Sequence, residues 1–488
     1  MTLLDPKTWQ ARTLSGGEYE VTEPATGEGL GALTLATADD ITAAVAAARA
    51  AQPGWARTPH FARAAVLRRA GDLFTAYAGG TSQAFGSGGE LREWLVRESG
   101  SIPGKADFEL HVAAQECYEA AALASRPLGE VLPSEEPRLS FTRRVPVGVV
   151  GVIAPFNAPL ILSIRSVAPA LALGNAVVLK PDPRTAVCGG LSLAAVFEEA
   201  GLPEGLLHVL PGGAEAGRAL VADPGVPVIS FTGSTAAGRA VGEAAGRLLK
   251  RAHLELGGNS ALVVLEDADI EGAVAQASWG SFFHQGQICM TTGRHLVHAS
   301  LYEEYVERLA ARADALAVGD PHREQVHLGP LIDRAQLAKV DGLVRASTAR
   351  GARLAAGGTH RDLFYRPTVL ADAADDTPAY AEEVFGPVAP VRSFRTLDEA
   401  AALAADGPYG LSLGIVTRDT ALGLELADRV PTGIAHINDQ TVNDEAVAPF
   451  GGVAASGTGA RFGGAANLEA FTELRWTTVR GRPEGHPF

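Results

Sequence analysis

One cysteine lies in a sequence context that suits a reactive thiol. Cys289 is in a glycine-flanked, partly polar turn, residues 281–294 (SFFHQGQICMTTGR), that follows an apolar segment. A thiolate is a good nucleophile where its surroundings favour the ionised form, and Gly286 and Gln287 allow the close backbone approach that such a site needs. Cys289 is therefore a candidate catalytic nucleophile.

The other cysteines and a nearby histidine have simpler interpretations. A lone cysteine usually behaves as a small buried hydrophobic residue, and Cys117 and Cys188, in alanine-rich helical segments, fit that description. The same interpretation stays open for Cys289. His284 precedes it by five residues, but the cysteine–histidine pairs of peptidases are normally distant in sequence, so this spacing indicates little.

Two further side chains could assist a nucleophile. Glu255, in residues 254–259 (LELGGN), places a carboxylate at an apolar strand end, where burial raises a pKa toward that of a general base. The alternative is a structural glutamate that accepts backbone hydrogen bonds beside the glycines. Asn157, in PFNAP just past an apolar run, could stabilise an oxyanion or form an Asx turn before a helix.

Two other strand ends carry groups that suit a nucleotide. Lys180 ends an apolar run in LKP and is either a ligand contact or a solvated terminus. Phe231–Ser234 (FTGS) ends another run, and its glycine and N-cap residue could contact an anion or a ribose. Gly27–Ala32 fits the loose dinucleotide fingerprint but lacks its strand and helix, so we interpret it as a turn between strands; no GxxxxGK[ST] sequence occurs.

These candidates fall in a regular alternation of apolar runs and helical segments. From about residue 147 to 265, apolar runs alternate with alanine-rich segments such as Thr185–Ala200 and Thr235–Lys250. The alternation predicts a parallel sheet with helices on both faces, a doubly wound α/β fold whose ligands bind beyond the carboxyl ends of the strands. The predicted strands are Val147–Ile153, Ala176–Leu179, Leu206–Leu210, Val226–Phe231 and Ala261–Leu265, with a helix beginning near Pro159.

Segments outside this unit complete the expected organisation. Asp39–Ala51 is expected as a helix with Thr37 as its N-cap. The glycine- and serine-rich residues 79–90 are expected as a loop of unassigned role. A second α/β region should cover about residues 266–440, with strands at His295–His298, Leu413–Thr417 and Ala435–Ile437, and two alternating runs, Arg138–Arg144 and Leu474–Val479, are expected as exposed strands.

Composition excludes several classes of protein. The 488 residues are 47% hydrophobic and 20% charged, as expected for a folded globular chain of two or three domains. The acidic excess of 15 would repel a phosphate backbone, so no nucleic-acid partner is expected. Prolines interrupt the uncharged run Val145–Ile164, so no membrane span is expected, and the first residues lack a secretory signal. A cytoplasmic location follows as an expectation.

No metal site is expected either. The sequence has no HExxH pattern and no paired ligand spacing, and its three cysteines are scattered. His322 and His327 are expected in loops.

Seven motifs in order resemble the aldehyde dehydrogenase superfamily. They are PFNAP, LKP, FTGS, LELGG, GQIC, EEVFGP and PFGG, and the resemblance runs from about residue 20 to the C-terminus with a poor match at residues 79–90. The segments SIRSVAPALALGNAVVLKPD, GQICMTTGRH and HINDQTVNDEAVAPFGG look most like the benzaldehyde, salicylaldehyde and vanillin dehydrogenase branch.

The resemblance implies a mechanism. Cys289 would add to the aldehyde carbon, and the Asn157 amide and the Cys289 backbone N–H would stabilise the resulting oxyanion. Loss of hydride to a nicotinamide would leave a thioester, which water activated by Glu255 would hydrolyse. A CoA-acylating relative would often lack the glutamate, and a catalytically silent protein on the same scaffold should have lost one of these three residues, so both alternatives are less favoured.

The resemblance also implies a nicotinamide dinucleotide site. Lys180 would hold the adenosine ribose and Glu383, of EEVFGP, the nicotinamide ribose, unless Glu383 is an exposed helix-cap acid. Pro183 stands where many NAD-preferring relatives have a glutamate, so we expect both NAD and NADP to work. Asp182 would replace the glutamate contact if its side chain turns inward, and Arg184 would favour NADP if it reaches the phosphate. The expected cofactor contacts are Ile153, Pro155, Phe156, Lys180, Asp182, Pro183, Gly212, Gly213, Gly233, Ser234, Glu383 and Phe385.

An aromatic substrate is expected by the same route. Ala158 is small where many relatives carry a bulky residue, which leaves room for a flat ring. Arg165 is expected near the entrance, where it would favour a phenolic or anionic ring substituent, unless it is a surface arginine in a salt bridge. The expected pocket residues are Ala158, Leu162, Arg165, Phe283, Ile288, Met290 and Phe450.

The family architecture implies three parts. Residues 1–126 and 146–255 would form the cofactor domain and residues 256–440 the catalytic domain. Residues 127–145 and 470–482 would supply oligomerisation strands, whose edges are open to pairing, so a homodimer or homotetramer is expected.

Overall fold

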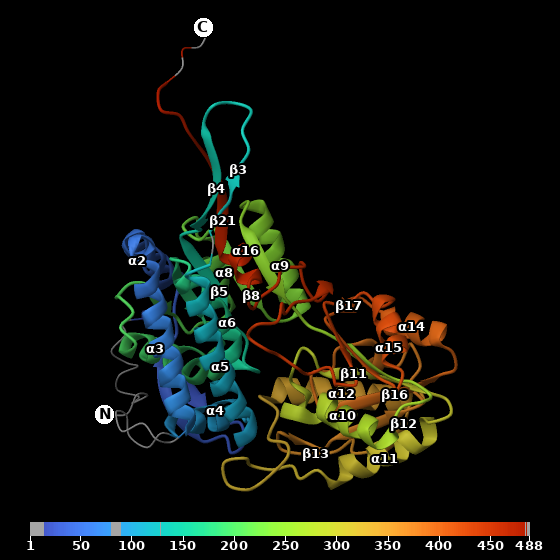
Figure 1. Cartoon of the computed structure of the whole chain (residues 1–488). Coiled ribbons are helices and arrows are strands. Elements are labelled where there is room, and N and C mark those ends of the chain that lie inside the picture. The colour runs from blue at the N-terminus through green and yellow to red at the C-terminus, as the bar shows by residue number, and fades with distance from the viewer. Residues whose placement is uncertain (1–13, 80–88, 127, 484, 486–488) are drawn as a thin grey trace.

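The chain folds into two α/β bodies and a projecting antiparallel sheet (Figure 1). A computed structural model describes residues 14–79, 89–126, 128–483 and 485. The two bodies lie side by side, and the projecting sheet extends from the first of them (Figure 1). The predicted loop at residues 79–90 falls largely outside the described residues.

The first body is built on a five-stranded sheet in which all neighbouring strands are parallel. Its order is β7–β6–β5–β8–β9. The central strands are buried at every residue, as expected for a sheet that is covered on both faces. The predicted doubly wound α/β fold is thus confirmed. The strands are β5 (Val149–Ile153), β6 (Ala176–Lys180), β7 (Leu207–Val209), β8 (Val228–Thr232) and β9 (Arg251–Glu255).

One strand was assigned to the wrong sheet. The predicted run Ala261–Leu265 corresponds to β10 (Ser260–Val264), which lies in the second body, and the outer strand of the first sheet is β9 instead. β10 is as apolar as the strands of the first sheet, so hydrophobicity could not assign it. Only its hydrogen-bonded neighbours, β11 and β18, do so.

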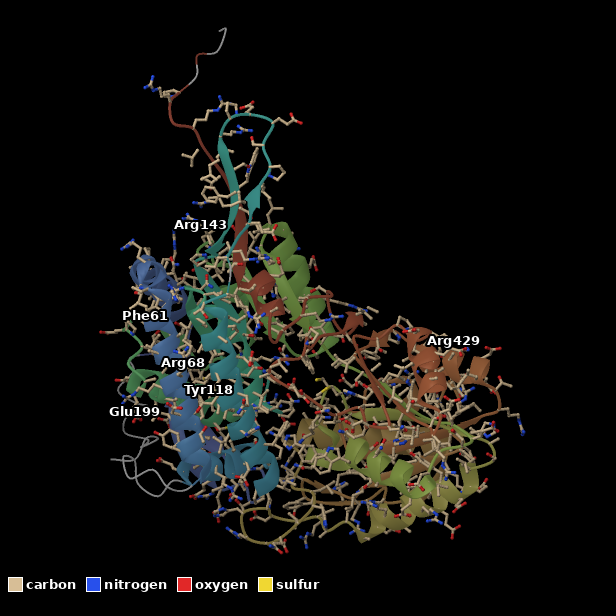
Figure 2. All side chains as sticks on the ribbon, viewed as in Figure 1. Phe61, Arg68, Tyr118, Arg143, Glu199 and Arg429 are labelled. Atoms are coloured by element: carbon tan, nitrogen blue, oxygen red, sulfur yellow. The ribbon has the colours of Figure 1, made fainter. Side chains whose placement is uncertain are left out.

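Helices cover both faces of the first sheet. On one side lie α2 (Ala38–Arg57) and α8 (Ala214–Ala222), with α9 (Thr235–Arg247) beside β8 and β9. On the other side lies α6 (Pro159–Ala172), and α5 (Pro103–Leu123) packs on α6 with α3 (His60–Gly79) outside it. Glu199, at the end of α7 (Ser192–Glu199), accepts a hydrogen bond from Tyr77 of α3 at 3.1 Å and joins these layers (Figure 2). The remaining helix is α4 (Glu90–Ser99).

Local helix signals were correct in part. Thr37 caps α2 through a full capping box with Asp40, and the helix runs six residues beyond the predicted end. The predicted helix Thr185–Ala200 is helical but not one α-helix. A π-helical segment, Val187–Leu191, precedes α7, and within it Gly189 lies against Pro159 and Gly190 against Pro181.

The second body is built on a seven-stranded sheet, order β12–β15–β16–β11–β10–β18–β19, parallel except at β12. Helices α10 and α11 cover one face, and α13, α14 and α15 cover the other. The strands are β10, β11 (Thr292–His298), β12 (Arg353–Ala356), β15 (Thr368–Ala371), β16 (Val388–Phe394), β18 (Ser412–Val416) and β19 (Ile434–Ile437), and the helices are α10 (Ile270–Phe282), α11 (Tyr302–Ala315), α12 (Arg334–Ala349), α13 (Pro378–Ala381), α14 (Leu397–Ala405) and α15 (Thr420–Asp428).

The two exposed alternating runs pair with each other. β4 (Leu139–Pro146) and β21 (Thr472–Val479) are antiparallel along their whole length, and β3 (Val131–Leu132) adds to the far edge of β4. This projecting sheet carries exposed apolar side chains, among them Trp476 at 63% and Val131 at 77% exposure.

Short pairs complete the fold. α16 (Ala466–Phe471) precedes β21. Gly27 lies in the turn before β2, as expected, but Gly29–Ala32 already belong to that strand. The short pairs are β1 (Glu18–Thr22) with β2 (Gly29–Thr34), β13 (His360–Arg361) with β14 (Phe364–Tyr365), and β17 (Tyr409–Gly410) with β20 (Val453–Ala454).

Candidate active site

The candidate site lies where the two sheets meet edge to edge. Asn157 follows the carboxyl end of β5, Lys180 ends β6 and Glu255 ends β9. The chain then enters the second sheet at Ser260, and Cys289 lies just before β11, at the same starting edge. The carboxyl edge of the first sheet therefore faces the amino edge of the second, and the predicted residues converge there.

The segment before Cys289 has an unusual backbone. His284, Gln285 and Gly286 all have positive φ angles, of 49°, 56° and 66°. Two of these are not glycine, so the surrounding structure must hold them in a sparsely populated conformation. The Gln285 amide donates to the carbonyls of Gly100 and Pro330, and Gln287 accepts from the Ile332 N–H at 3.0 Å. These bonds fix the turn that presents Cys289.

A cavity of about 660 Å³ opens onto Cys289 and Asn157. Its lining is mainly apolar, and the stacked rings of Trp279 and Phe283, 4.2 Å apart between centroids, form part of it. All seven predicted pocket residues line this cavity. The sequence did not identify its other lining residues, which come from α5 and the residue before it, α6, α10 and the loop after β19: Ile102, Gly104, Lys105, Phe108, Ile161, Trp279, Asp439, Gln440, Val442, Asn443 and Asp444.

The surroundings of Cys289 favour the neutral form of its thiol. Burial raises its pKa to about 12, and the nearby carboxyl groups of Glu255, Glu383 and Asp444 add to that rise. Arg165 opposes it. The two other cysteines, Cys117 and Cys188, are fully buried in helical segments, as predicted, and burial raises the pKa of both thiols.

Glu255 is buried without the backbone partners that a structural role would require. Its side chain is 1% exposed, and within the described chain neither carboxylate oxygen has a hydrogen-bond partner. Burial raises its pKa from an ordinary value of 4.5 to about 8, against the attraction of Arg165 and Arg461 and the proximity of the Gly452 amide. The carboxyl group is thus poised to exchange a proton near neutral pH.

Arg165 is buried, so the alternative of a surface arginine is wrong. Its residue is 2% exposed, and its guanidinium lies over the rings of Phe450 and Phe462 at 4.8 and 5.2 Å. Nη2 donates to the Thr232 hydroxyl at 3.2 Å, while Nε and Nη1 have no hydrogen-bond partner in the described residues. The side chain lies within the cavity wall and offers donors to whatever enters.

Acidic groups surround Arg165. Burial raises the pKa of Glu116, on α5, to about 8 and also raises that of Asp444, and Arg165 lowers both. Arg165 therefore lies among carboxyl groups whose pKa values are raised by burial.

Asn157 does not cap the helix that follows it. The N-cap position of α6 is Ala158, and no side-chain cap hydrogen bond is formed there. Asn157 is 3% exposed and lines the cavity beside Cys289. Asn157 therefore lines the same cavity as Cys289 and does not occupy the N-cap position of α6.

Lys180 is buried rather than solvated. Its Nζ donates to the carbonyl oxygens of Gly212 at 2.8 Å and Pro181 at 3.2 Å. Gly212 and Gly233 have no room for a side chain, because a Cβ on either would lie 2.7 Å from Ala216 or Phe231. Ser234 caps α9 at the carboxyl end of β8, so the first turn of α9 opens at the sheet edge where a phosphate group could bind.

Glu383 is partly buried and its carboxylate is hydrogen-bonded, so the exposed helix-cap interpretation is wrong. Its Oε1 accepts from the Gly258 N–H at 3.0 Å, and Gly257 packs against the same carboxylate. Burial raises its pKa. Phe385 has a φ angle of 57°, and its ring meets that of Phe156 edge to face at 5.9 Å. The carboxylate can accept further hydrogen bonds from hydroxyl groups, and the two hydroxyls of a ribose could donate them.

Asp182 and Arg184 bind each other. Arg184 donates to Asp182 at 2.8–2.9 Å and to Asp333, the N-cap of α12, at 2.6 Å. Its guanidinium also lies 4.2 Å above the Phe156 ring. Pro183 begins a short 3₁₀ turn that Asp182 caps. The charge of Arg184 is therefore already matched by two carboxylates.

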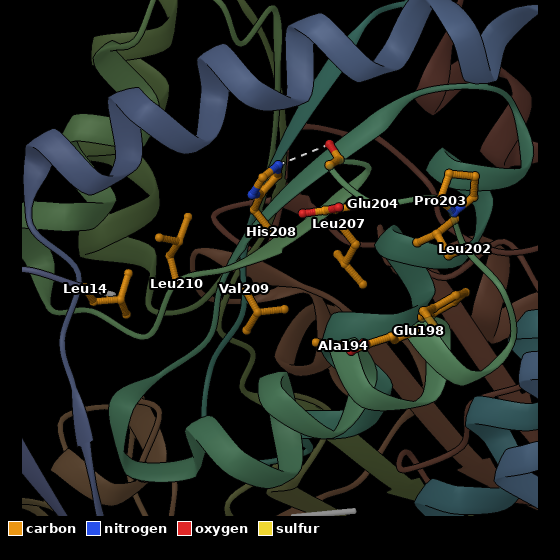
Figure 3. A pocket seen from close by; sticks show the side chains of 12 residues that line it. Leu14, Ala194, Glu198, Leu202, Pro203, Glu204, Leu207, His208, Val209 and Leu210 are labelled. Carbon is orange, nitrogen blue, oxygen red and sulfur yellow. Dashed lines mark hydrogen bonds between the residues drawn. The ribbon is translucent and has the colours of Figure 1, made fainter. Parts of the chain in front are cut away.

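The described chain has a second cavity away from the predicted site residues. This cavity, of about 490 Å³, lies beside β7, where His208 bonds to the Gly205 carbonyl at 3.1 Å (Figure 3). It has no predicted site residue in its lining. In residues 14–79, 89–126, 128–483 and 485, no cluster of three potential metal ligands occurs, and no helix is long and apolar enough to span a membrane.

Comparison with known proteins gives consistent matches. The model of the aldehyde dehydrogenase family matches residues 9–477. The chain is 68% identical to a vanillin dehydrogenase of Amycolatopsis sp. over all of both chains, and 49% identical to a benzaldehyde dehydrogenase [NAD(+)] of Pseudomonas putida over 97% of this chain and 95% of that one. A salicylaldehyde dehydrogenase from Pseudomonas putida G7, solved with salicylaldehyde, has a TM-score of 0.91 at 34% identity and covers 97% of this chain and 96% of its own.

The raised pKa of Glu255 predicts a pH-dependent effect of Glu255→Gln on stability. The folded state holds the Glu255 proton up to about pH 8, while the unfolded chain releases it near pH 4.5, so this residue contributes a loss of stability as pH rises between these values. Glutamine is neutral throughout. The melting temperature of Glu255→Gln relative to the native chain should therefore rise from pH 5 to pH 8 and level off above.

Thermal melts at five or six pH values test this. The control is Glu382→Gln, which removes an exposed carboxylate. A difference in melting temperature that stays constant from pH 5 to pH 9 would contradict a raised pKa at Glu255.

Proposed function

The chain belongs to the aldehyde dehydrogenase family, and on that premise we propose that it oxidises an aromatic aldehyde to the carboxylic acid with NAD or NADP as the hydride acceptor. The observation that carries the proposal is the cavity itself. It joins Cys289 and Asn157 to a mainly apolar, aromatic-lined space of about 660 Å³. The relatives named for vanillin, benzaldehyde and salicylaldehyde oxidation match nearly the whole chain.

Cys289 is proposed as the nucleophile. Its sulfur adds to the aldehyde carbon, and its proton must leave, because burial holds the thiol pKa near 12. Glu255 is the nearby acceptor with a pKa, about 8, that allows a substantial ionised fraction at weakly alkaline pH. The carbonyl oxygen becomes an oxyanion, which the Asn157 amide and the Cys289 backbone N–H stabilise in a site from which water is largely excluded.

The second half of the reaction is hydrolysis. A nicotinamide dinucleotide held by Lys180 and Glu383 would accept the hydride that leaves the former aldehyde carbon. The acyl group then remains on Cys289 as a thioester, and Glu255 takes a proton from the water that attacks it. The acid product leaves and the thiol is restored. Because neither Glu255 oxygen is committed to a partner in the described chain, the carboxylate is available to a water molecule.

The cofactor would lie along the carboxyl edge of the first sheet. Lys180 and Glu383 would hold the two riboses, and the start of α9 at Ser234 would face the pyrophosphate. Phe385 and Phe156 would flank the nicotinamide end. The residues Ile153, Pro155, Gly212, Gly213 and Gly233 would complete the path.

The substrate ring would lie between Ala158 and the apolar walls of the cavity. Phe283 and Trp279 already stack on each other, so a third flat ring can extend the aromatic wall. Arg165 offers two unpartnered N–H donors in the same space, and they suit a hydroxyl, methoxy or carboxylate oxygen on the ring. The Arg165 guanidinium lies over the face of the Phe450 ring.

A CoA-acylating reaction is the alternative for the second half. It would need no general base for water, yet Glu255 is present, buried and unpartnered in the described chain. That observation favours water as the acyl acceptor.

We also propose a homodimer or homotetramer assembled through the projecting sheet. Trp476, Leu474 and Val131 are 58–77% exposed there, and β21 has a free edge. An exposed apolar strand edge is an aggregation hazard unless another strand or sheet covers it. In the same way, residues 1–126 with 146–255 are proposed as the cofactor domain and residues 256–440 as the catalytic domain.

Replacement of the nucleophile tests the mechanism. Cys289→Ala should lower kcat by at least about 10³-fold, because without the sulfur no thioester forms. Its melting temperature and its affinity for NAD, measured by fluorescence quenching, should stay close to native. Cys117→Ala, which removes a buried thiol from α5, is the matched control and should retain activity. Turnover above a few per cent in folded Cys289→Ala would refute the assignment.

The substrate class is tested by filling the cavity. The native enzyme should have a higher kcat/KM for benzaldehyde than for propanal. Ala158→Leu should lower kcat/KM for benzaldehyde by about tenfold or more, since overpacking a fixed wall costs about 1–3 kcal/mol, while propanal changes by less than about threefold. A native preference for propanal, or equal losses for both aldehydes, would argue against a ring site at Ala158.

The cofactor preference is expected to be weak. Position 183 is a proline rather than a glutamate, and Arg184 is already paired with Asp182 and Asp333. The values of kcat/KM for NAD and NADP should therefore differ by less than about 100-fold, or roughly 2.7 kcal/mol. Asp333→Asn keeps a capping side chain but removes one charge from Arg184, so it should shift the ratio toward NADP severalfold. A native preference above a thousandfold would mean that another contact selects the cofactor.

A further inference from the structure

A buried ion pair on α5 contacts the backbone of the Asn157 loop. Lys105 and Glu109 lie one turn apart, are 2% and 0% exposed, and form a salt bridge. The Lys105 Nζ also donates to the Asn157 carbonyl oxygen at 2.7 Å. The Glu109 Oε2 accepts from the backbone N–H of Leu160 at 3.0 Å and of Ile161 at 3.4 Å. The pair therefore forms hydrogen bonds with the backbone on both sides of Ala158.

The start of α6 depends on this pair for its hydrogen bonds. The first N–H groups of a helix need acceptors from outside the helix, and the N-cap, Ala158, has no side chain that can supply one. Pro159 has no N–H, so Leu160 and Ile161 carry the first amides, and Glu109 accepts from both. Its negative charge also interacts favourably with the helix N-terminus. The direction of α6 is therefore set by a side chain of α5.

Stability alone is a weak explanation for such a pair. Two charges taken out of water lose much of their hydration energy, and apolar residues of similar size often serve stability equally well. What an apolar pair could not do is bind one carbonyl and two amides of the same short loop. His284, from the turn before Cys289, lies close enough to the Asn157 carbonyl and to Lys105 for both to affect its pKa, so the two catalytic segments meet at this point.

We propose that Lys105 and Glu109 are positioning residues that hold the backbone of Asn157 and the first turn of α6 so that the Asn157 side-chain amide faces the reacting carbonyl oxygen. The inference rests on the proposed function, in which that amide stabilises the oxyanion. Lys105 lines the cavity, but its Nζ is bonded to Glu109 and to the Asn157 carbonyl, so it acts through Asn157 rather than on the substrate.

A double-mutant cycle tests the proposal. The measured quantity is the single-turnover rate of NADH formation with benzaldehyde at saturating NAD. Lys105→Met should lower this rate by about 10- to 100-fold, since a displacement of about 1 Å at a reacting group can cost that much. Asn157→Ala should lower it by about 10²–10³-fold. In the Asn157→Ala background, Lys105→Met should add less than about threefold, because the amide that it positions is gone.

Lys250→Met is the matched control. Lys250 likewise donates to two backbone carbonyls, those of Val221 and Asp223, but it lies before β9, at the amino edge of the same sheet. Its loss should leave the rate of hydride transfer within about twofold of native, because the oxyanion site is at the opposite edge. Lys105→Arg, which retains a charged donor, should recover part of the rate that Lys105→Met loses.

A second variant covers the case in which Lys105→Met fails to fold, because it leaves Glu109 as an unpaired buried charge. Lys105→Met with Glu109→Gln removes both charges and keeps an acceptor for α6; it should fold, bind NAD normally and transfer hydride slowly. A native rate in this double variant, or an undiminished effect of Lys105→Met in the Asn157→Ala background, would overturn the proposal. If Asn157→Ala itself left the rate unchanged, the proposed oxyanion role would fail instead, and the two failures are thereby separated.

Discussion

The constraint on which the structure depends is the meeting of two parallel sheets at opposite edges. β9 ends at Glu255 and β10 begins at Ser260, so only four residues carry the chain from one sheet to the other. Four residues span at most about 14 Å, and the two edges must therefore abut. The groups that follow β5 and β9 in the first sheet therefore lie near the starts of β10 and β11 in the second. Gly258, within this crossing, packs against the backbone of Cys289, and any side chain there would separate the proposed base from the proposed nucleophile.

Burial controls the chemistry of the groups that meet at this junction. It raises the pKa of Cys289 to about 12 and that of Glu255 to about 8, and Arg165 opposes both rises. The proposed proton transfer from Cys289 to Glu255 should therefore be favoured by a rise in pH, which increases the ionised fraction of Glu255.

The orientation of the Asn157 loop at the junction depends on helix α5, which lies outside α6. α5 packs on α6, and through Lys105 and Glu109 it bonds to the loop that carries Asn157. The strained turn at His284 and Gln285 is likewise held by carbonyls of Gly100 and Pro330, which lie far from it in sequence. The loop that carries Asn157 and the turn before Cys289 are therefore both held by hydrogen bonds to segments distant in sequence.

The sequence by itself determined the features that are encoded locally. Apolar runs predicted four of the five strands of the first sheet, Thr37 and Ser234 marked helix starts, and the ordered motifs led to Cys289, Asn157 and seven further residues that line the cavity. Only the tertiary structure showed that β10 belongs to the second sheet and that Arg165 is buried. It also showed that Arg184 is paired with Asp182 and Asp333. The hydrogen bonds of Lys105 and Glu109 to the loop around Asn157 were likewise visible only there. The physical reason is the range of the interactions. Strand and helix signals arise between residues a few positions apart, whereas burial, pKa and the partner of a charged side chain depend on segments that the fold brings together from 50 to 150 positions away.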